Sequence, residues 1–429
     1  VCVPFLRTRC MPRIAHPAPL RTPFLSLPAG VPWALSLALL LAPAGCGGDG
    51  GDPPRAILVS IDALNEEILR RTLTEAEAPV LHALFDEGAC AEHAVSHFPS
   101  VTAASHATLW TGAWGDVHGI TSNTMPRLPR DAHSILESWN GFHYQALAAE
   151  PLWITAGRVG VSVAGHHVTQ APGVPGYPAV TGERTEWQEA RRRESARVLA
   201  SPHVHVMNGY NSRPVQQRMI RGQDVRWVPG AGWVGPEEWA SLLPPRVFEL
   251  EMGPLGVLHG AVVALGGEET GGAPVYDALL LAREPSGAGA VMARLAPPES
   301  EPLASGRSLA RHFSDPLPVP AEGGRAWIPV RLFELAPDGS DFLLYQPPIH
   351  LVEGNRDEMT AAYEEAIGGW TGNSGFMVYR NGGFGPTLAQ GGDGTAEARY
   401  LETAEHLLRQ FRDGSEWLWR THGPRLLMD

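Results

Sequence analysis

Lysine is absent from this 429-residue sequence, and all 33 basic residues are arginine. The absence excludes enzymes that depend on a Schiff-base lysine, a P-loop lysine or a kinase lysine. Cysteine is scarce: there are four, and none is spaced as a CxxC pair or another zinc-binding pattern. Positive charge is also in deficit. The formal net charge of −13 argues against a general binder of nucleic acid or anionic membranes.

The first 46 residues have the pattern of an export signal. Arginines precede an apolar run over 33–42, and no charged residue lies between Arg21 and Asp49. The run ends in Leu-Ala-Pro-Ala-Gly-Cys, which resembles a bacterial lipoprotein signal with Cys46 as the lipidated residue. The alternatives are an ordinary cleaved signal and an uncleaved anchor, although a spanning helix needs about 20 apolar residues. We expect an exported protein, either lipid-anchored or periplasmic in the bacterial cell envelope, or secreted. If Cys46 is acylated, Cys90 is left without a disulfide partner.

The candidate catalytic and ligand-binding residues lie between 56 and 123. The continuous apolar run Ala56–Ile61 predicts a strand buried on both faces, as in a parallel sheet. Asp62 follows at the carboxyl end, where open α/β sheets bind ligands. Thr102 comes in the turn before a helix-like stretch that Gly112 closes. Its hydroxyl therefore faces unpaired N–H groups and the positive end of a helix dipole, a place that favours anions.

This stretch resembles the type I phosphodiesterase/nucleotide pyrophosphatase branch of the alkaline phosphatase superfamily. That branch has an Asp ending the first strand, a Thr within an FPTxT-type segment, a following Thr-Gly, and an HGI…N segment. The matching residues are Asp62, 98–102, 111–112, and 118–120 with Asn123. The resemblance covers roughly residues 55–165. It implies an α/β fold, an alkaline-phosphatase-like three-layer sandwich with a mostly parallel central sheet, here incomplete and carrying a β-rich insertion.

The resemblance also implies metal-dependent hydrolysis of phosphodiester or pyrophosphate bonds. Two divalent metal ions, Zn²⁺ in such enzymes, would activate an oxygen nucleophile and spread the charge of the transferring group. Asp62 and Thr102 would bind metal. Thr102 would attack phosphorus and form a covalent phosphothreonine, and Asn123 would donate an N–H to a phosphoryl oxygen. The partner would be a small phosphorylated substrate, with no nucleic-acid polymer expected, and a membrane contact would come through lipid on Cys46.

Each of these residues also has an ordinary structural explanation. Asp62 can cap the next helix, Thr102 can be an N-cap or bond back within its helix, and Asn123 can stabilise a turn. Their joint order and spacing favour the catalytic interpretation. His106 and His118 correspond to structural positions in the family, so we assign neither to metal.

The substrate is less sharply defined. Nucleotide-hydrolysing members often have an aromatic residue directly after the nucleophile, and here Ala103 follows Thr102. A generic phosphodiester or phosphonate is therefore favoured over a nucleotide. The sulfatase branch is disfavoured because no CxPxR motif is present. The alternatives are a phosphomonoesterase or phosphonate hydrolase on the same scaffold, and a non-catalytic envelope binding protein.

The remaining chain falls into segments by composition and periodicity. They are a signal peptide (1–46), a Gly/Pro linker (47–54), the α/β part with the nucleophile (55–246), a β-rich insertion or cap (247–350), and a return to the α/β domain (351–429). We expect helices at Glu66–Leu73, from Pro79 to just before Gly88, and at Pro151–Gly157, Glu183–Leu199, Glu358–Ile367 and Thr395–Thr421. We expect strands at Cys90–Ser96, Val159–Ala164, Val257–Leu265, Ala278–Ala282, Ala290–Leu295, Trp327–Leu335, Phe342–Tyr345, Phe376–Tyr379 and from Leu426. His203 and His205 alternate on another expected strand, and without a third ligand nearby they fit its polar side better than a metal site.

The sequence stops at Asp429, inside the strand expected from Leu426. The resemblance implies further metal ligands beyond this point, in a D-x-x-x-H, then a D-H pair and a final His. We therefore expect a C-terminally truncated sequence. Reading the gene past Asp429 should reveal these motifs in that order, and their absence would favour the binding protein. The 429-residue chain itself should be inactive; zinc-dependent turnover from it would contradict this expectation.

Overall fold

The structure is a computed structural model that describes residues 2–3, 54–62, 64–91, 94–127, 131–176, 185–230, 233, 235–266, 273–284, 291–297, 313–322, 324–372 and 375–429. The expected signal peptide with Cys46, and the linker, lie outside the described residues except at 2–3 and 54. The chain divides into two compact units. Unit 1 comprises 1–54 and 61–95, and unit 2 comprises 55–60 and 96–429. No described helix combines the length and apolarity needed to cross a membrane.

Unit 1 contains two short helices and a two-stranded sheet. α1 (Glu66–Thr72) begins at Asn65, whose side chain accepts a hydrogen bond from the backbone N–H of Ile68. α2 (Pro79–Glu87) has Pro79 in its first turn and ends before Gly88, as expected. β1 (Cys2–Val3) pairs antiparallel with β3 (Ala89–Cys90).

Two expectations for this unit need correction. The expected strand Cys90–Ser96 is wrong beyond its first residue, because β3 ends at Cys90 and the described residues that follow pair with no strand. Cys90 was expected to lack a partner if Cys46 carries lipid, but Cys90 is disulfide-bonded. The β1–β3 pairing also places Cys2 directly opposite Cys90. Cys2 and Cys90 are far apart in the sequence, so no local sequence pattern could predict that they lie opposite each other.

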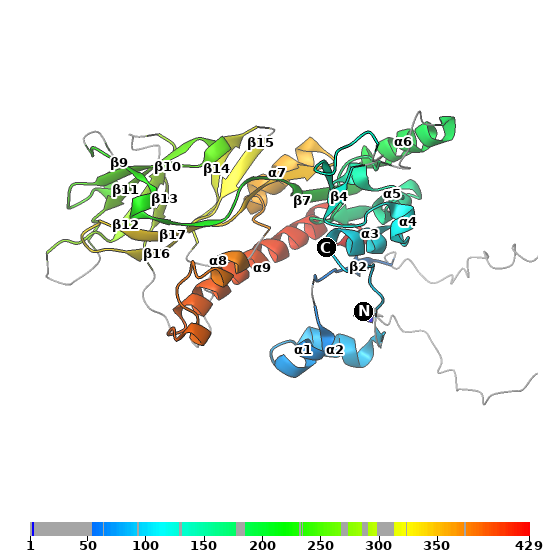
Figure 1. Ribbon diagram of the computed structural model, residues 1–429, viewed down its shortest axis with the longest axis horizontal. Coiled ribbons are helices and arrows are strands. Elements are labelled where there is room, and N and C mark those ends of the chain that lie inside the picture. Colours follow the sequence, from blue (N-terminus) through cyan, green and yellow to red (C-terminus); the bar gives the residue numbers. More distant parts are fainter. Residues whose placement is uncertain are drawn as a thin grey trace, which may run out of the picture. The chain divides into compact units, whose positions relative to one another are not determined.

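Unit 2 is built on a mostly parallel five-stranded sheet of order β18-β7-β6-β19-β2 (Figure 1). Its strands are β2 (Ala56–Leu58), β6 (Val163–Gly165), β7 (Val204–Val215), β18 (Ile349–Gly354) and β19 (Leu426–Met428). The pairs β7–β6, β6–β19 and β19–β2 are parallel, whereas β18 runs antiparallel to β7. Strands from the two ends of unit 2, β2 and β19, thus lie side by side in this sheet.

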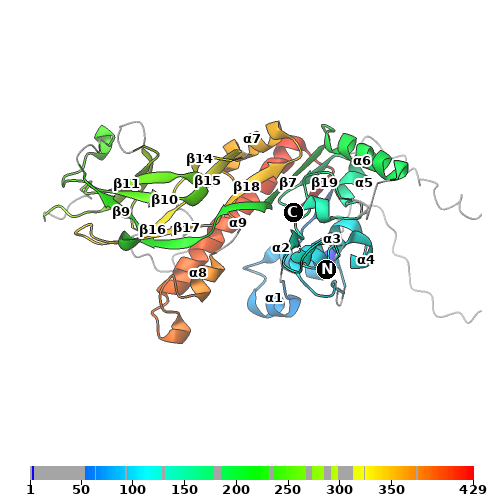
Figure 2. The ribbon, with the colours of Figure 1, turned by 45° about the horizontal axis from the view of Figure 1, so that its top comes forward.

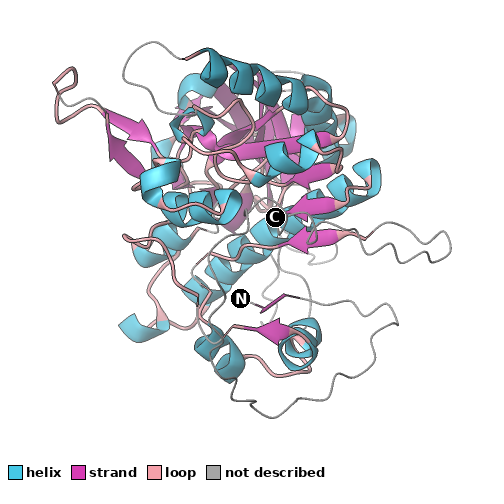
Figure 3. Cartoon of the chain, turned by 90° about the vertical axis from the view of Figure 1, so that its right-hand side faces the viewer, coloured by secondary structure: helices cyan, strands magenta, loops and turns pink. Residues whose placement is uncertain are grey.

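Helices cover both faces of this sheet, as Figure 3 shows. On one face, α5 (Leu152–Arg158) and α6 (Glu186–Leu199) share an apolar cluster with β6, β7 and Met428. On the other, α7 (Asp357–Ile367) and α9 (Thr395–His422) pack with Leu427 and further β6 and β7 residues. Because strand side chains alternate between faces, neighbouring residues of β19 serve different layers. The arrangement is consistent with the alkaline-phosphatase-like fold that the resemblance implies.

Several details of the sheet differ from expectation. The run Ala56–Ile61 was expected to be buried on both faces, but β2 ends at Leu58 and Ile57 is 52% exposed. The reason is position: β2 is an edge strand with β19 as its single neighbour. Asp429 was expected inside the last strand, and its backbone does continue the pairing of β19 (Leu426–Met428) with β2. Its N–H donates to Leu58 O at 2.9 Å, and its O accepts from the N–H of Ser60 at 2.8 Å.

The expected strand Phe376–Tyr379 is wrong, because these residues form helix α8 (Phe376–Arg380). A short apolar run does not by itself separate strand from helix. Here Gly375, with φ of +74°, starts the helix, and the ring of Tyr379 stacks on Tyr400 of α9 with centroids 5.0 Å apart. Tertiary contact with α9 therefore decides the local structure.

Antiparallel strands fill the chain between β7 and β18. One sheet has the order β13-β12-β11-β10-β9, a second has the order β16-β17-β8, and β14 pairs with β15. Figure 2 labels β9, β10, β11 and β14 to β17 among these strands. The strands are β8 (Arg218–Arg221), β9 (Arg226–Val228), β10 (Arg246–Glu251), β11 (Val257–Val263), β12 (Ala278–Ala282), β13 (Val291–Leu295), β14 (Leu317–Ala321), β15 (Gly324–Ile328), β16 (Arg331–Leu335) and β17 (Phe342–Gln346). They share one apolar cluster. The expected β-rich character is confirmed, with strands starting earlier than residue 247.

Helix α9 links the antiparallel region to the central sheet. Its 28 residues span about 42 Å, and it contacts β6 near one end and α8 near the other. Where it passes β16, the Nε atom of Arg331 donates to the Glu402 carboxylate, and both side chains are almost fully buried. Burial raises the pKa of Glu402, and the adjacent guanidinium partly opposes that rise.

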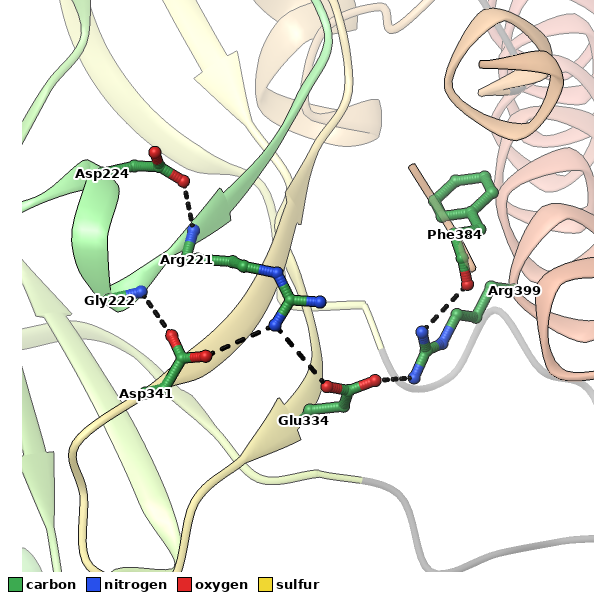
Figure 4. A network of polar contacts seen from close by, with 7 residues as sticks. All are labelled: Arg221, Gly222, Asp224, Glu334, Asp341, Phe384 and Arg399. Atoms are coloured by element: carbon green, nitrogen blue, oxygen red, sulfur yellow. Dashed lines mark hydrogen bonds and ion pairs between the residues drawn. The ribbon is translucent and has the colours of Figure 1, made fainter. Parts of the chain in front are cut away.

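A second, more exposed network lies nearby (Figure 4). Glu334 of β16 contacts Arg399 of α9 and lies 3.9 Å from Arg221 of β8. Arg221 also contacts Asp341, which accepts a hydrogen bond from the backbone N–H of Gly222. The side chain of Glu334 is 48% exposed, so solvent screens this network more strongly than the Arg331–Glu402 pair.

Removal of Glu402 should destabilise unit 2 far more than removal of Glu334. Glu402→Ala leaves the buried Arg331 charge unpaired, which costs about 3–5 kcal/mol. Glu334→Ala breaks an exposed network and should cost about 1 kcal/mol or less. Urea unfolding followed by tryptophan fluorescence measures both. Equal shifts of the two midpoints would contradict this ranking.

Candidate active site

Helix α3 (Thr102–Thr111) starts at the candidate nucleophile. Val101 precedes it in an extended conformation, and Gly112 closes it with φ of +65°. Three alanines on its buried face allow close packing against residues of the following loop and strand. They are Ala103, Ala104 and Ala107, all fully buried. The predicted helix and its Gly end are confirmed, and Thr102 is its first residue.

Asn123 lies directly against the start of this helix. The backbone N–H of Ala103 donates to Asn123 Oδ1 at 2.9 Å, and the backbone N–H of Gly141 donates to Asn123 O at 2.9 Å. Asn123 precedes β4 (Thr124–Pro126), which pairs with β5 (Ser138–Asn140) just before Gly141. The structure therefore brings Asn123 to the residue after Thr102, across 20 positions of sequence.

Asp62 is a separate case. It lies in the turn after β2, its side chain is exposed, and it belongs to unit 1, whereas Thr102 and Asn123 belong to unit 2. Within the residues that the structure describes, no three His, Cys, Asp or Glu side chains gather in a way that could hold a metal ion. These side chains do not by themselves build the two-metal site that the resemblance implies. The metal roles of Asp62 and Thr102 stay predictions.

The two histidines of the motif region have structural contacts. His106 links the helix to the end of β2, because its Nδ1 lies 2.8 Å from Thr102 O and its Nε2 lies 2.9 Å from Ser60 Oγ. His118, in α4 (Gly115–His118), is fully buried. Its Nδ1 accepts from the N–H of Ile120 at 3.0 Å, and its Nε2 lies 3.0 Å from Thr108 Oγ1. These contacts agree with the structural assignment.

The other two histidines that the sequence singled out, His203 and His205, lie in different surroundings. β7 begins at Val204, so His203 lies just outside it and is exposed. His205 is buried, and its ring stacks on His422 of α9 with centroids 3.7 Å apart. Burial, with a smaller contribution from His422, lowers the pKa of His205 to about 4.

Sequence reasoning missed the segment that follows β6. Gln170 is fully buried, and its Nε2 donates to Ala103 O at 3.2 Å and to Gly141 O at 2.7 Å. In the same segment, His166 Nδ1 lies 3.0 Å from Asp429 Oδ1. His166 thus reaches the residue that follows β19, whereas Gln170 reaches the start of α3 and the residue after β5. The only signal in the sequence is polar residues directly after a short apolar strand, which does not identify their partners.

Comparison with known proteins bears on the whole region from β2 to β8. Residues 56–219 match the model of the family described as type I phosphodiesterase / nucleotide pyrophosphatase. The resemblance predicted from the motifs is confirmed. The match includes Asp62, Thr102 and Asn123, as well as Gln170, and it ends before most of the antiparallel region.

Two curated relatives are similar over part of this stretch. An ectonucleotide pyrophosphatase/phosphodiesterase of Caenorhabditis elegans is 28% identical over 109 residues, which is 25% of this chain and 12% of that protein. A bis(5'-adenosyl)-triphosphatase of Mus musculus is 30% identical over 108 residues, covering 24% of this chain and 21% of that protein. The chain thus spans about a fifth or less of the length of these relatives.

The pH dependence of stability should include a contribution from His118. Burial, reinforced by nearby His97, lowers the pKa of His118 to about 4 from an ordinary value of 6.5. Between these values the unfolded chain binds the proton and the folded chain does not, so stability falls as pH drops from about 6.5 to about 4. His118→Gln should reduce this pH dependence in urea unfolding at pH 4.5 and 7. His203→Gln, at an exposed position, is the control and should follow the wild-type curve; coincidence of the His118→Gln and wild-type curves would contradict the assignment.

Proposed function

We propose that this protein hydrolyses phosphodiester or pyrophosphate bonds, with Thr102 as the nucleophile. The observation that carries the proposal is the contact between Asn123 Oδ1 and the N–H of Ala103, inside the region that matches the phosphodiesterase family. Among the contacts of the described residues, this one joins two parts of the motif at the start of one helix. A phosphoryl group bound there would meet both a hydroxyl and an amide.

The chemistry follows from the helix start. The first N–H groups of α3 lack intrahelical partners, and the helix dipole favours an anion at this end. Because the amide oxygen of Asn123 accepts from Ala103, the NH₂ end of the same amide is the end that donates to a phosphoryl oxygen. Attack of Thr102 Oγ1 on phosphorus forms a phosphothreonine and releases the first alcohol or phosphate; water then breaks the Thr–phosphate bond. Asn123 stabilises the negative charge on the phosphoryl oxygens in the transition state.

The family generally depends on Zn²⁺, and we extend the metal dependence to this protein as part of the proposal. Two divalent ions would supply activation of the hydroxyl and neutralisation of charge, with Asp62 and Thr102 among the ligands. We also propose export to the cell envelope, with lipid on Cys46 of the processed chain. In that chain Cys90 would lose Cys2, the residue opposite it in β1.

The substrate class stays broad for a physical reason. Ala103 is fully buried in the cluster beneath α3, so the position after the nucleophile offers no ring for stacking on a base. This favours a small phosphodiester or phosphonate over a nucleotide. One relative is named a bis(5'-adenosyl)-triphosphatase, which makes such a triphosphate a suitable assay compound.

Turnover should depend on the hydroxyl of Thr102. The protein expressed from its full open reading frame is assayed with bis- and mono-p-nitrophenyl phosphate and bis(5'-adenosyl) triphosphate, with and without zinc. Thr102→Ala should lower kcat by roughly 10³-fold or more, because the covalent route is lost, whereas Thr102→Ser should retain part of the activity. Asn123→Ala should cost roughly 10²–10³-fold.

Folding of each variant is checked by its unfolding midpoint. Unchanged turnover in a folded Thr102→Ala protein would remove Thr102 from the mechanism. Faster hydrolysis of the monoester than of the diester would favour the phosphomonoesterase alternative. Tight binding of these compounds without turnover would favour the binding protein.

A further inference from the structure

Asn123 and Gln170 are joined through the same two residues. Ala103 donates its N–H to Asn123 Oδ1, and its carbonyl accepts from Gln170 Nε2. Gly141 donates its N–H to Asn123 O, and its carbonyl accepts from the same Gln170 Nε2. The backbone N–H of Gln170 donates to Phe142 O at 3.0 Å as well. One buried side chain therefore connects the start of α3 with the loop that carries Asn123.

The orientation of the Gln170 amide follows from its partners. Two carbonyl oxygens require the NH₂ end, and Gln170 Oε1 accepts from Thr169 Oγ1 at 2.6 Å. Thr169 Oγ1 in turn accepts from Trp110 Nε1 at 2.9 Å, on α3 itself. Both N–H groups and the oxygen of the Gln170 amide have partners, so the network holds this side chain in one orientation and depends on an amide. A glutamate would place oxygen against two carbonyls, and a leucine would donate nothing.

The backbone is also unusual at this point. Among the described residues, His167 and Gln170 are the non-glycine residues with positive φ, at +51° and +58°. Such a conformation is uncommon for residues with a Cβ, and it persists where surrounding contacts impose it. Gly141 is held closely too, because a Cβ there would lie 2.1 Å from Ser122 O. The loop fits against the helix start only in a narrow geometry.

We propose that Gln170 is a positioning residue of the candidate active site. It holds the carbonyls of Ala103 and Gly141, and thereby keeps the Asn123 amide aligned beside Thr102. The residue touches neither substrate nor the reacting atoms; it acts through Asn123. The catalytic part of this proposal rests on the proposed function, whereas the positioning itself rests on the hydrogen bonds alone.

The chain offers a matched control. Gln346 in β17 is also fully buried, and its Nε2 donates to Gln216 O at 3.2 Å and Pro347 O at 2.8 Å. Gln346 Oε1 also accepts from Arg218 Nε at 3.1 Å. Gln170→Met and Gln346→Met therefore each remove three side-chain hydrogen bonds while nearly conserving volume. A loss of stability alone should be similar in the two variants. Faster hydrogen exchange at the two backbone amides that donate to Asn123 is expected only from Gln170→Met.

Amide hydrogen exchange tests the positioning without any turnover. As a first-turn amide, the N–H of Ala103 has no intrahelical partner, so its protection comes from Asn123. In Gln170→Met, exchange at Ala103 and Gly141 should accelerate by roughly tenfold, and in Gln346→Met it should not. Unchanged exchange at both amides in folded Gln170→Met would overturn the inference. If Gln170→Met does not fold, Thr169→Val, which removes the donor to Gln170 Oε1, should show the same direction with a smaller effect, and no effect there would overturn the inference instead.

Kinetics test the catalytic consequence in the protein from the full open reading frame. With bis-p-nitrophenyl phosphate, Gln170→Met should lower kcat roughly 10- to 100-fold with little change in KM, because a misplaced Asn123 amide stabilises the transition state less well. Gln346→Met should stay near wild type. A Gln170→Met kcat equal to that of Gln346→Met would overturn the catalytic role. If the wild-type protein hydrolyses none of the substrates, the proposed function fails while the exchange result still decides the positioning role.

Discussion

The hydrogen bond from the Ala103 N–H to Asn123 Oδ1 is the contact on which the candidate site depends. A helix leaves its first N–H groups without partners, and here a side chain from a loop 20 residues later satisfies one of them. Meeting that partner requires the loop to lie flat on the helix, which the alanine face of α3 permits and Gln170 secures. The same arrangement brings Asn123 to the residue that follows Thr102, which is the arrangement that the proposed phosphoryl chemistry uses.

Sequence patterns predicted the features that local physics determines. The periodic apolar face of α9, the proline start of α2 and the Gly112 end of α3 each depend on a few neighbouring residues. The predicted burial of the run Ala56–Ile61 was wrong, because burial depends on whether a strand lies at the centre or the edge of its sheet. The predicted strand Phe376–Tyr379 was wrong because contact with Tyr400 decides its structure. The role of Gln170 could not be predicted from the sequence, because its partners lie 67 and 29 residues away and no spacing pattern indicates them.

The region that matches the family does not contain the whole central sheet. Matched residues end at 219, inside β8, yet β18 and β19 of the central sheet come after the antiparallel strands. β7 pairs with strands that come before and after the antiparallel region in the sequence. Its first residues pair with β6 and its later residues pair with β18. Helix α9 then returns along the molecule, tied to β16 by the buried Arg331–Glu402 pair, and delivers the chain to β19.

The position of β19 has a consequence for the order in which the molecule can form. Ala56 pairs with Leu426, a separation of 370 residues (426 − 56), and β19 lies between β2 and β6. While the ribosome is still making the antiparallel region, β2 has no partner and β6 lacks its inner neighbour. The sheet that supports Thr102 can close only after β19 has been synthesised, so assembly of the central sheet must wait until translation has passed Met428. Pairing over such a distance makes closure slow and exposes strand edges in the interval.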